Sequence, residues 1–135
     1  MKRFVDASAW IALADRDDQN HDRAAAFLKQ HAATGVSHTS NYVISETVTR
    51  LRRTAGPRVA WKLFDDLHAS DLVRIHYSDE ALDQEAIRLF KKYEDQELSF
   101  VDCTTAAILD RMGIDEIFAF DDDFRRVGYT VVPGD

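Results

Sequence analysis

The sequence predicts an α/β protein whose sheet is mainly parallel and covered by helices on both faces. Short apolar or β-branched segments alternate with longer segments of helical periodicity along all 135 residues. Only five Gly and two Pro interrupt them, and there is no internal repeat or long linker. Parallel strands need crossover connections, so this alternation favours βαβ units. The length fits a single domain over residues 1–135.

The first half of the chain is predicted to contain two strands and four helices. An apolar helix follows the first strand, and an Ala-rich helix stopped by Gly35 comes next. Ser40 is expected to cap the third helix, and Pro57 to open the fourth. The expected elements are strands at 3–6 and 36–39, a helix starting in 8–15, a helix at 20–35, a helix from Ser40 to about 55, and a helix at 57–70.

The second half is predicted to add three strands. Residues 71–78 alternate and are β-branched, which is typical of a strand. Ser99 and Asp102 form an S-x-x-D capping box in front of a helix that ends at Gly113. The other expected elements are a helix from about 79 to 95 with an apolar stripe of Leu82, Ile87, Leu89 and Phe90, strands at 117–120 and 129–132, and a short helix at 123–127.

Composition argues against several classes of protein. No apolar run approaches the ~20 residues of a membrane span, and acids interrupt the N-terminal segment where a signal peptide would continue. The single cysteine, Cys103, excludes an internal disulfide and a multi-cysteine zinc site. We therefore expect a cytoplasmic protein that does not contact a membrane. The net charge of −7 argues against binding nucleic acid through bulk electrostatics, so any such role must be local.

Acidic residues recur at the ends of elements that are distant in sequence. Asp6 ends the first predicted strand, Asp121 ends the strand at 117–120, and Asp102 lies in the first turn of its helix. Glu46 lies within the first two turns of the helix capped by Ser40. Ligands of open parallel sheets bind beyond the carboxyl ends of the strands, so these acids are candidates for one shared site.

Each of these acids also has a purely structural interpretation. Asp6 could cap the helix that follows it, and Glu46 could pair with Arg50 one turn later. The capping box explains Asp102. Either Asp121 or Asp123 could cap the short helix at 123–127, and Asp122 between them is expected to be exposed.

Four motifs make the resemblance to a known family specific. FVDASAW, SNYVISETVTRL, SFVDCTTAAI and FAFDDDF occur in this order along the chain. Together they resemble PIN domains, and most closely the VapC-type toxins of bacterial toxin–antitoxin pairs. The resemblance implies a Rossmann-like PIN fold, with a five-stranded, mainly parallel sheet flanked by helices, and a metal-dependent ribonuclease. It maps the family's acidic quartet and accompanying residues onto Asp6, Glu46, Asp102 and Asp121, with Asp123 as a fifth acid, Ser8 as a supporting hydroxyl, and Thr104 or Thr105 as another.

Oxygen-only ligands suit one or two Mg²⁺ or Mn²⁺ ions, which would activate a water for phosphodiester hydrolysis. Asp6, Asp102 and Asp121 are the expected ligands, and Glu46 either binds the metal or orients the attacking water. The five histidines show no close metal-ligand spacing, so zinc is not expected. A basic segment could hold flanking RNA phosphates, although a solvated helix face is the more common explanation of such a segment. Its members are Arg50, Arg52, Arg53, Arg58 and Lys62, of which the first three are the predicted RNA-binding residues.

The resemblance also implies partners. A cognate antitoxin would cover the acidic crevice, and the toxin would form a homodimer. The competing hypothesis is a non-catalytic PIN-like module that binds RNA or protein. Trp10, Phe27 and Trp61 could line a partner groove, but a position in the core is the simpler expectation for each.

Overall fold

The computed structural model describes residues 2–31 and 35–134, and in them five strands form one sheet. The bounds of the strands are β1 (Arg3–Val5), β2 (Ser37–Ser40), β3 (Val73–His76), β4 (Glu116–Phe118) and β5 (Thr130–Val132). The bounds of the helices are α1 (Ala7–Ala14), α2 (His21–His31), α3 (Asn41–Thr54), α4 (Pro57–Ala69), α5 (Glu80–Lys92), α6 (Phe100–Met112) and α7 (Asp123–Arg126).

The sheet has the order β3-β2-β1-β4-β5, and every neighbouring pair is parallel. The central strand is β1, in which Phe4 pairs with His38 of β2 and with Ile117 of β4. The chain extends the sheet from β1 in one direction with β2 and β3, and in the other with β4 and β5. The strand order therefore reverses beside β1, which is where open α/β sheets form their ligand crevice.

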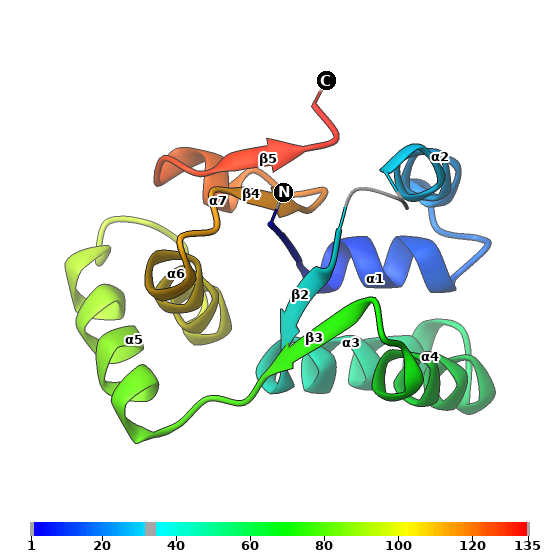
Figure 1. The fold of residues 1–135 in the computed structure, drawn as a ribbon, viewed down its shortest axis with the longest axis horizontal. Helices are drawn as coiled ribbons and strands as arrows, with labels where there is room; N and C mark the ends of the chain where they lie inside the picture. The colour runs from blue at the N-terminus through cyan, green and yellow to red at the C-terminus, as the bar shows by residue number, and fades with distance from the viewer. Residues whose placement is uncertain (1, 32–34, 135) are drawn as a thin grey trace.

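Helices cover both faces of this sheet (Figure 1). Helices α5 and α6 lie on one side, and α1, α2 and α4 lie on the other. The predicted α/β class with a parallel five-stranded sheet is thus confirmed. No helix in the part of the chain described here is long and apolar enough to cross a membrane.

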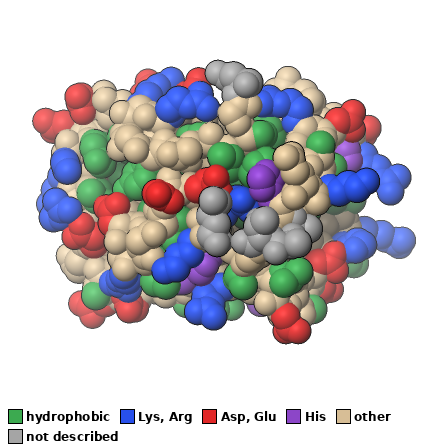
Figure 2. Space-filling view, turned by 45° about the horizontal axis from the view of Figure 1, so that its top comes forward, with side chains coloured by type: hydrophobic (Ala, Val, Ile, Leu, Met, Phe, Trp, Pro, Cys, Tyr) green, Lys and Arg blue, Asp and Glu red, His purple; other side chains and the backbone are tan. Residues whose placement is uncertain are grey.

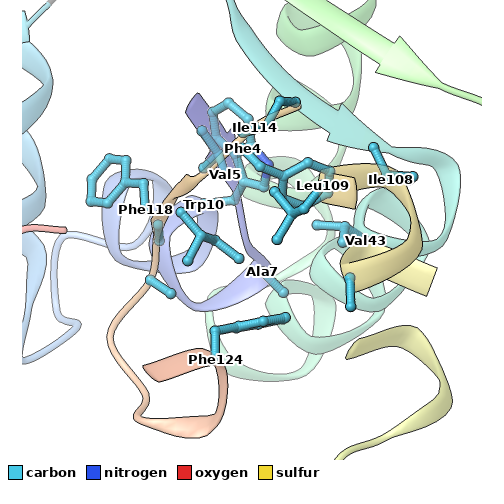
Figure 3. Close-up of a cluster of buried hydrophobic side chains, with 14 of the residues drawn as sticks. Phe4, Val5, Ala7, Trp10, Val43, Ile108, Leu109, Ile114, Phe118 and Phe124 are labelled. Atoms are coloured by element: carbon cyan, nitrogen blue, oxygen red, sulfur yellow. The ribbon is translucent and has the colours of Figure 1, made fainter. Parts of the chain in front are cut away.

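The main core lies between β1, β4 and the helices packed on them (Figure 3). Side chains from both faces of the central strand are buried, including Phe4 and Val5. Trp10 of α1 is also buried, as predicted, and its indole N–H donates to Thr39 Oγ1 at 3.1 Å. Phe27 is partly buried against this core and lies 4.6 Å from Phe118 between ring centroids. These rings pack around the end of β1. The position of the end of β1, and of the start of α1 that follows it, is therefore held by the core.

Local signals set most of the helix ends. Ser40 caps α3 by accepting from the N–H of Val43 at 3.1 Å. Ser99 and Asp102 form the predicted capping box of α6, which ends at Gly113 in the left-handed region at φ 65°. Only glycine adopts that conformation without a steric cost, so the stop is encoded locally.

The strand predicted at 117–120 is confirmed as β4, with bounds at Glu116–Phe118; beyond its end the N–H of Phe120 donates to the hydroxyl of Ser8. Two expectations about these elements were wrong. In α5 only Leu82 and Leu89 of the predicted apolar stripe are buried; Ile87 and Phe90 are 36% and 49% exposed. Trp61 is 63% exposed rather than in the core.

Other element bounds differ from prediction by a few residues. The helix predicted at 79–95 is α5, which ends at Lys92, and the strand predicted at 71–78 is β3, which is confined to four residues. Helix α2 is described as far as His31, and the predicted continuation through 32–34 lies outside the described residues.

Candidate active site

The central strand delivers Asp6 into the interior of the molecule. Asp6 follows Val5 directly and is 4% exposed, and its N–H donates to the carbonyl of Phe118 on β4 at 3.0 Å. It occupies the N-cap position of α1, but its side chain makes no cap hydrogen bond. The predicted capping role is therefore not the role of the carboxylate.

Other carboxylates act on Asp6 electrostatically. Burial, followed by the charges of Asp121 and Asp102, raises the pKa of Asp6 to about 7, and Glu46 adds a smaller contribution. Since like charges act this way only when they are near one another, the structure brings all four acids of the predicted quartet into one neighbourhood. Glu46 is half-buried on α3, and the alternative ion pair with Arg50 is not formed.

Asp102 combines a structural role with membership of this group. Its Oδ2 accepts from the N–H of Ser99 at 3.1 Å, which completes the capping box. Burial nevertheless raises its pKa to about 6, and the charges of Asp121 and Asp123 act in the same direction against the hydrogen bonds to Ser99. The capping interpretation is thus confirmed, but the same carboxylate also interacts with the other acids of the site.

Asp121 lies beyond the end of β4, in the loop before α7. Burial, followed by the charge of Asp123, raises its pKa, and a hydrogen bond with Asp6 opposes the rise. Asp6 and Asp121 therefore lie close enough for their carboxyl groups to interact directly. Two buried carboxyls in contact repel each other when both are ionised, and either a proton or a cation relieves that repulsion.

Of the two acids predicted as possible caps of the short helix, Asp121 accepts from the N–H of Asp123 at 3.4 Å, and Asp123 lies inside the helix. Asp122 stands at the N-cap of α7, but its side chain makes no cap hydrogen bond and pairs instead with Arg125 at 2.9 Å. Asp123 lies within α7 and pairs with Arg126 at 3.5 Å. Asp122 is exposed as predicted, whereas Asp123 is half-buried and acts on both Asp102 and Asp121.

Of the predicted supporting hydroxyls, that of Ser8 contacts Asp6 directly. Ser8 Oγ donates to Asp6 Oδ2 at 3.2 Å and accepts from the N–H of Phe120 at 3.0 Å, so it ties the loop of Asp121 to Asp6. Thr104 donates to the carbonyl of Val101 at 2.6 Å. Thr105 is fully buried, and its Oγ1 has no hydrogen-bond partner. An unsatisfied buried hydroxyl calls for an explanation, and a bound water or ion would supply one.

Comparison with known proteins agrees with this geometry. The sequence model of the PIN domain matches residues 3–129. The chain belongs to the PIN domain family. Two relatives, both 23S rRNA-specific endonuclease VapC20 from strains of Mycobacterium tuberculosis, are 34% identical to this PIN domain over 129 residues, which is 96% of each chain.

Solved structures show the same likeness. The crystal structure of Mycobacterium tuberculosis VapC20, a Sarcin-Ricin loop cleaving toxin, matches this PIN domain with a TM-score of 0.85 and 34% identity over 95% of this chain and 96% of that chain. VapBC2 from Rickettsia felis bound to a promoter DNA fragment matches with a TM-score of 0.74 over 97% of both chains. At 11% identity, that second likeness shows the fold alone.

The donor set of this PIN domain fits a hard divalent cation. The carboxyls of Asp6 and Asp121 interact with each other, and the charge of Asp102 acts on Asp6. Among the described residues, however, no three His, Cys, Asp or Glu side chains are already arranged to hold a metal ion together. These two findings are compatible because Mg²⁺ keeps several waters and uses only one or two carboxylates directly. A hydrated ion needs the charge of this pocket, not a closed cage of ligands.

The face of the molecule shown in Figure 2 carries charges of both signs. Lys, Arg, Asp and Glu side chains are interspersed over this face. The three predicted RNA-binding residues, Arg50, Arg52 and Arg53, are exposed on α3, the helix that carries Glu46.

Proposed function

We propose that this PIN domain, residues 1–135, is an endoribonuclease that hydrolyses RNA phosphodiester bonds with Mg²⁺ or Mn²⁺. The observation that carries the proposal is the buried carboxyl of Asp6, whose pKa is raised to about 7 by burial and by the charges of Asp121, Asp102 and Glu46. A pocket that stabilises added positive charge so strongly is suited to one or two divalent cations.

The residues of the pocket would have different roles in the reaction. Asp6, Asp102 and Asp121 would hold the cation, with Asp123 contributing charge from the half-buried start of α7. When bound, the cation lowers the pKa of a coordinated water and neutralises charge on the attacked phosphate. Glu46 orients the attacking water or joins the ligands. Ser8 keeps Asp6 and the loop of Asp121 in register through its two hydrogen bonds.

The substrate and partners follow from the relatives. The VapC20 proteins are named as 23S rRNA-specific endonucleases, so 23S rRNA is the first substrate to test. Arg50, Arg52 and Arg53 would hold phosphates that flank the cleaved bond. As a toxin, the protein would be inhibited by a cognate antitoxin over the acidic pocket and would act as a homodimer.

The experiment is a cleavage assay with purified protein freed of any partner. The substrates are an RNA stem-loop with the Sarcin-Ricin sequence and a stem-loop of unrelated sequence. We expect cleavage of the first with Mg²⁺ or Mn²⁺, none in EDTA, and a loss of at least about 100-fold for Asp6→Asn, as for removal of a group that stabilises charge in the transition state. The matched control is Asp122→Asn, which removes an exposed aspartate nearby and should cleave normally.

Two outcomes would contradict the proposal. Cleavage in EDTA, or wild-type cleavage by Asp6→Asn, would remove the metal assignment. RNA binding without cleavage under every metal tested would favour the non-catalytic module instead.

A further inference from the structure

The hairpin of α3 and α4 carries a local excess of positive charge. Residues 47–64 contain five basic and no acidic residues, so the remainder of the chain carries −12 against −7 for the whole. Arg50, Arg52, Arg53 and Arg58 are all exposed, and in the described part of the chain none of them forms an ion pair. Lys62 differs, because it pairs with Asp66 at 2.7 Å. Four uncompensated guanidinium groups on one hairpin suit a polyanion.

The same hairpin exposes aromatic side chains. Helix α4 buries one apolar stripe, with Ala60 and Leu67 at 4% exposure, and presents a second stripe on its outer side. That outer stripe contains Trp61, 63% exposed, and Phe64, 43% exposed and stacked on His68 with ring centroids 4.5 Å apart. Exposure of an indole to this extent is unusual and marks a binding surface more often than a packing defect.

A hollow of about 180 Å³ lies between the two helices beside this indole. It is smaller than the pockets of drug-sized ligands, which start near 300 Å³, and suits a single planar ring. Its walls include Val48, Thr49 and Arg52 of α3, and Pro57, Trp61 and Phe64 of α4. An arginine and an indole thus line the same small depression.

The hollow can be reached from the acidic pocket along α3. Glu46, Arg50 and Arg53 are spaced by four and three residues, so they lie on one face of the helix. From Glu46 to Arg53 the helix rises by about 10 Å. An RNA strand that leaves the acidic pocket would therefore first meet Arg50 and Arg53. It would then cross the exposed side of α3 and reach the hollow lined by Arg52 and Trp61.

We propose that Trp61 stacks an unpaired nucleobase of the RNA substrate in this hollow, while Arg52 and its neighbours hold the adjacent phosphates. The inference rests on the proposed function, because its ligand is the RNA that the acidic pocket would cleave. Sequence-tolerant binding of single strands uses this combination of a stacking aromatic ring and surrounding cations. RNA is favoured over a protein partner because four arginines of one sign, none of them paired with an acid among the described residues, match the repeating negative charge of a phosphate backbone.

The test measures RNA binding apart from cleavage. A fluorescein-labelled 12-nucleotide single-stranded RNA is titrated with Asp6→Asn protein in EDTA, and with the same protein carrying Trp61→Ala or Trp61→Phe. Stacking predicts that Trp61→Ala weakens binding by about 5- to 150-fold, and that Trp61→Phe, which keeps a ring, loses much less. The control is Leu72→Ala, which removes an exposed apolar side chain, 59% exposed, from outside the hairpin and should bind normally.

Intrinsic fluorescence gives a second readout. The protein has two tryptophans, and Trp10 is 6% exposed, so RNA should quench mainly the emission of Trp61. A duplex of the same sequence should quench it less, because its bases are already stacked.

The outcomes separate this inference from the proposed function. Equal RNA binding by Trp61→Ala and by the parent protein would overturn the inference. A lower molar mass of Trp61→Ala in light scattering would also overturn it, because Trp61 would then belong to an interface between protein chains. Quenching and weakened binding in a protein that never cleaves RNA would support the inference and overturn only the nuclease proposal.

Discussion

Replacing Asp6 with Asn should make the metal-free protein more stable while abolishing its activity. Asn keeps the shape of the side chain, its oxygen can accept from Ser8 Oγ, and its amide can donate to the neighbouring carboxylate of Asp121. What it removes is the negative charge that burial, Asp121 and Asp102 disfavour. A residue kept in spite of its effect on stability is kept for function.

The magnitude follows from the pKa of Asp6, which is raised from its ordinary value of 3.8 to about 7. That difference corresponds to about 4 kcal/mol of unfavourable interaction once the group is fully ionised. Because neighbouring carboxyls take up protons and side chains relax, we expect a gain of about 1–4 kcal/mol in the free energy of unfolding at pH 8.

The sign of the pH dependence is fixed by the same value. Between pH 4 and 7 the folded protein holds a proton on Asp6 that the unfolded chain has lost, so this group lowers stability progressively as the pH rises through that window. The advantage of Asp6→Asn should therefore be absent at pH 4 and largest at pH 8.

The assay is urea unfolding in EDTA at pH 4, 6 and 8. Asp122→Asn is the matched control, because Asp122 is exposed and its surface pair with Arg125 is worth about 0–1 kcal/mol. A loss of stability in Asp6→Asn at pH 8, or an equal gain in Asp122→Asn, would refute the reasoning.

Further predictions test the other parts of the site and the core. Adding Mg²⁺ should raise the melting temperature of the wild type at pH 8 and much less at pH 5. Protons compete with the cation for Asp6 and Asp102, because the pKa values of these groups are raised to about 7 and about 6. An equal rise in melting temperature at pH 5 and pH 8 would argue against these ligands. Ser8→Ala should lower kcat at least about 10-fold with little change in RNA affinity, because it frees the loop of Asp121 from Asp6; unchanged kcat in the cleavage assay would show that the bridge is dispensable. Leu109→Ala, at a side chain 1% exposed in α6, should cost about 2–5 kcal/mol in denaturant unfolding; a cost below 1 kcal/mol would mean that this part of the core collapses around the cavity.

Much of the fold could be predicted because its signals are local. The caps at Ser40 and Ser99 and the stop at Gly113 depend on residues within one helical turn of each other. The end of β4 could not be predicted in this way, since the hydroxyl of Ser8, more than a hundred positions away in sequence, takes the N–H of Phe120. Exposure of Trp61 was missed for a related reason. Helix α4 has two apolar stripes, and only the tertiary packing decides which of them is buried.

The candidate site was partly predictable from topology. Parallel strands bring their carboxyl ends to one edge, so Asp6 and an acid beyond β4 were expected to be neighbours. The direct interaction of Asp6 with Asp121, and the unsatisfied hydroxyl of Thr105, depend on side-chain positions that no spacing encodes. Asp122 and Asp123 pair with Arg125 and Arg126, three residues later in each case, and Asp121 accepts from the N–H of Asp123.

The most direct test of the shared carboxylate pocket is a crystal of the protein grown with Mn²⁺ and measured for anomalous scattering. The account predicts an anomalous peak within coordination distance of Asp6 and at least one of Asp102 and Asp121, and no peak there for Asp6→Asn. A wild-type crystal with Mn²⁺ bound only elsewhere, or with that pocket filled by water alone at millimolar Mn²⁺, would contradict it.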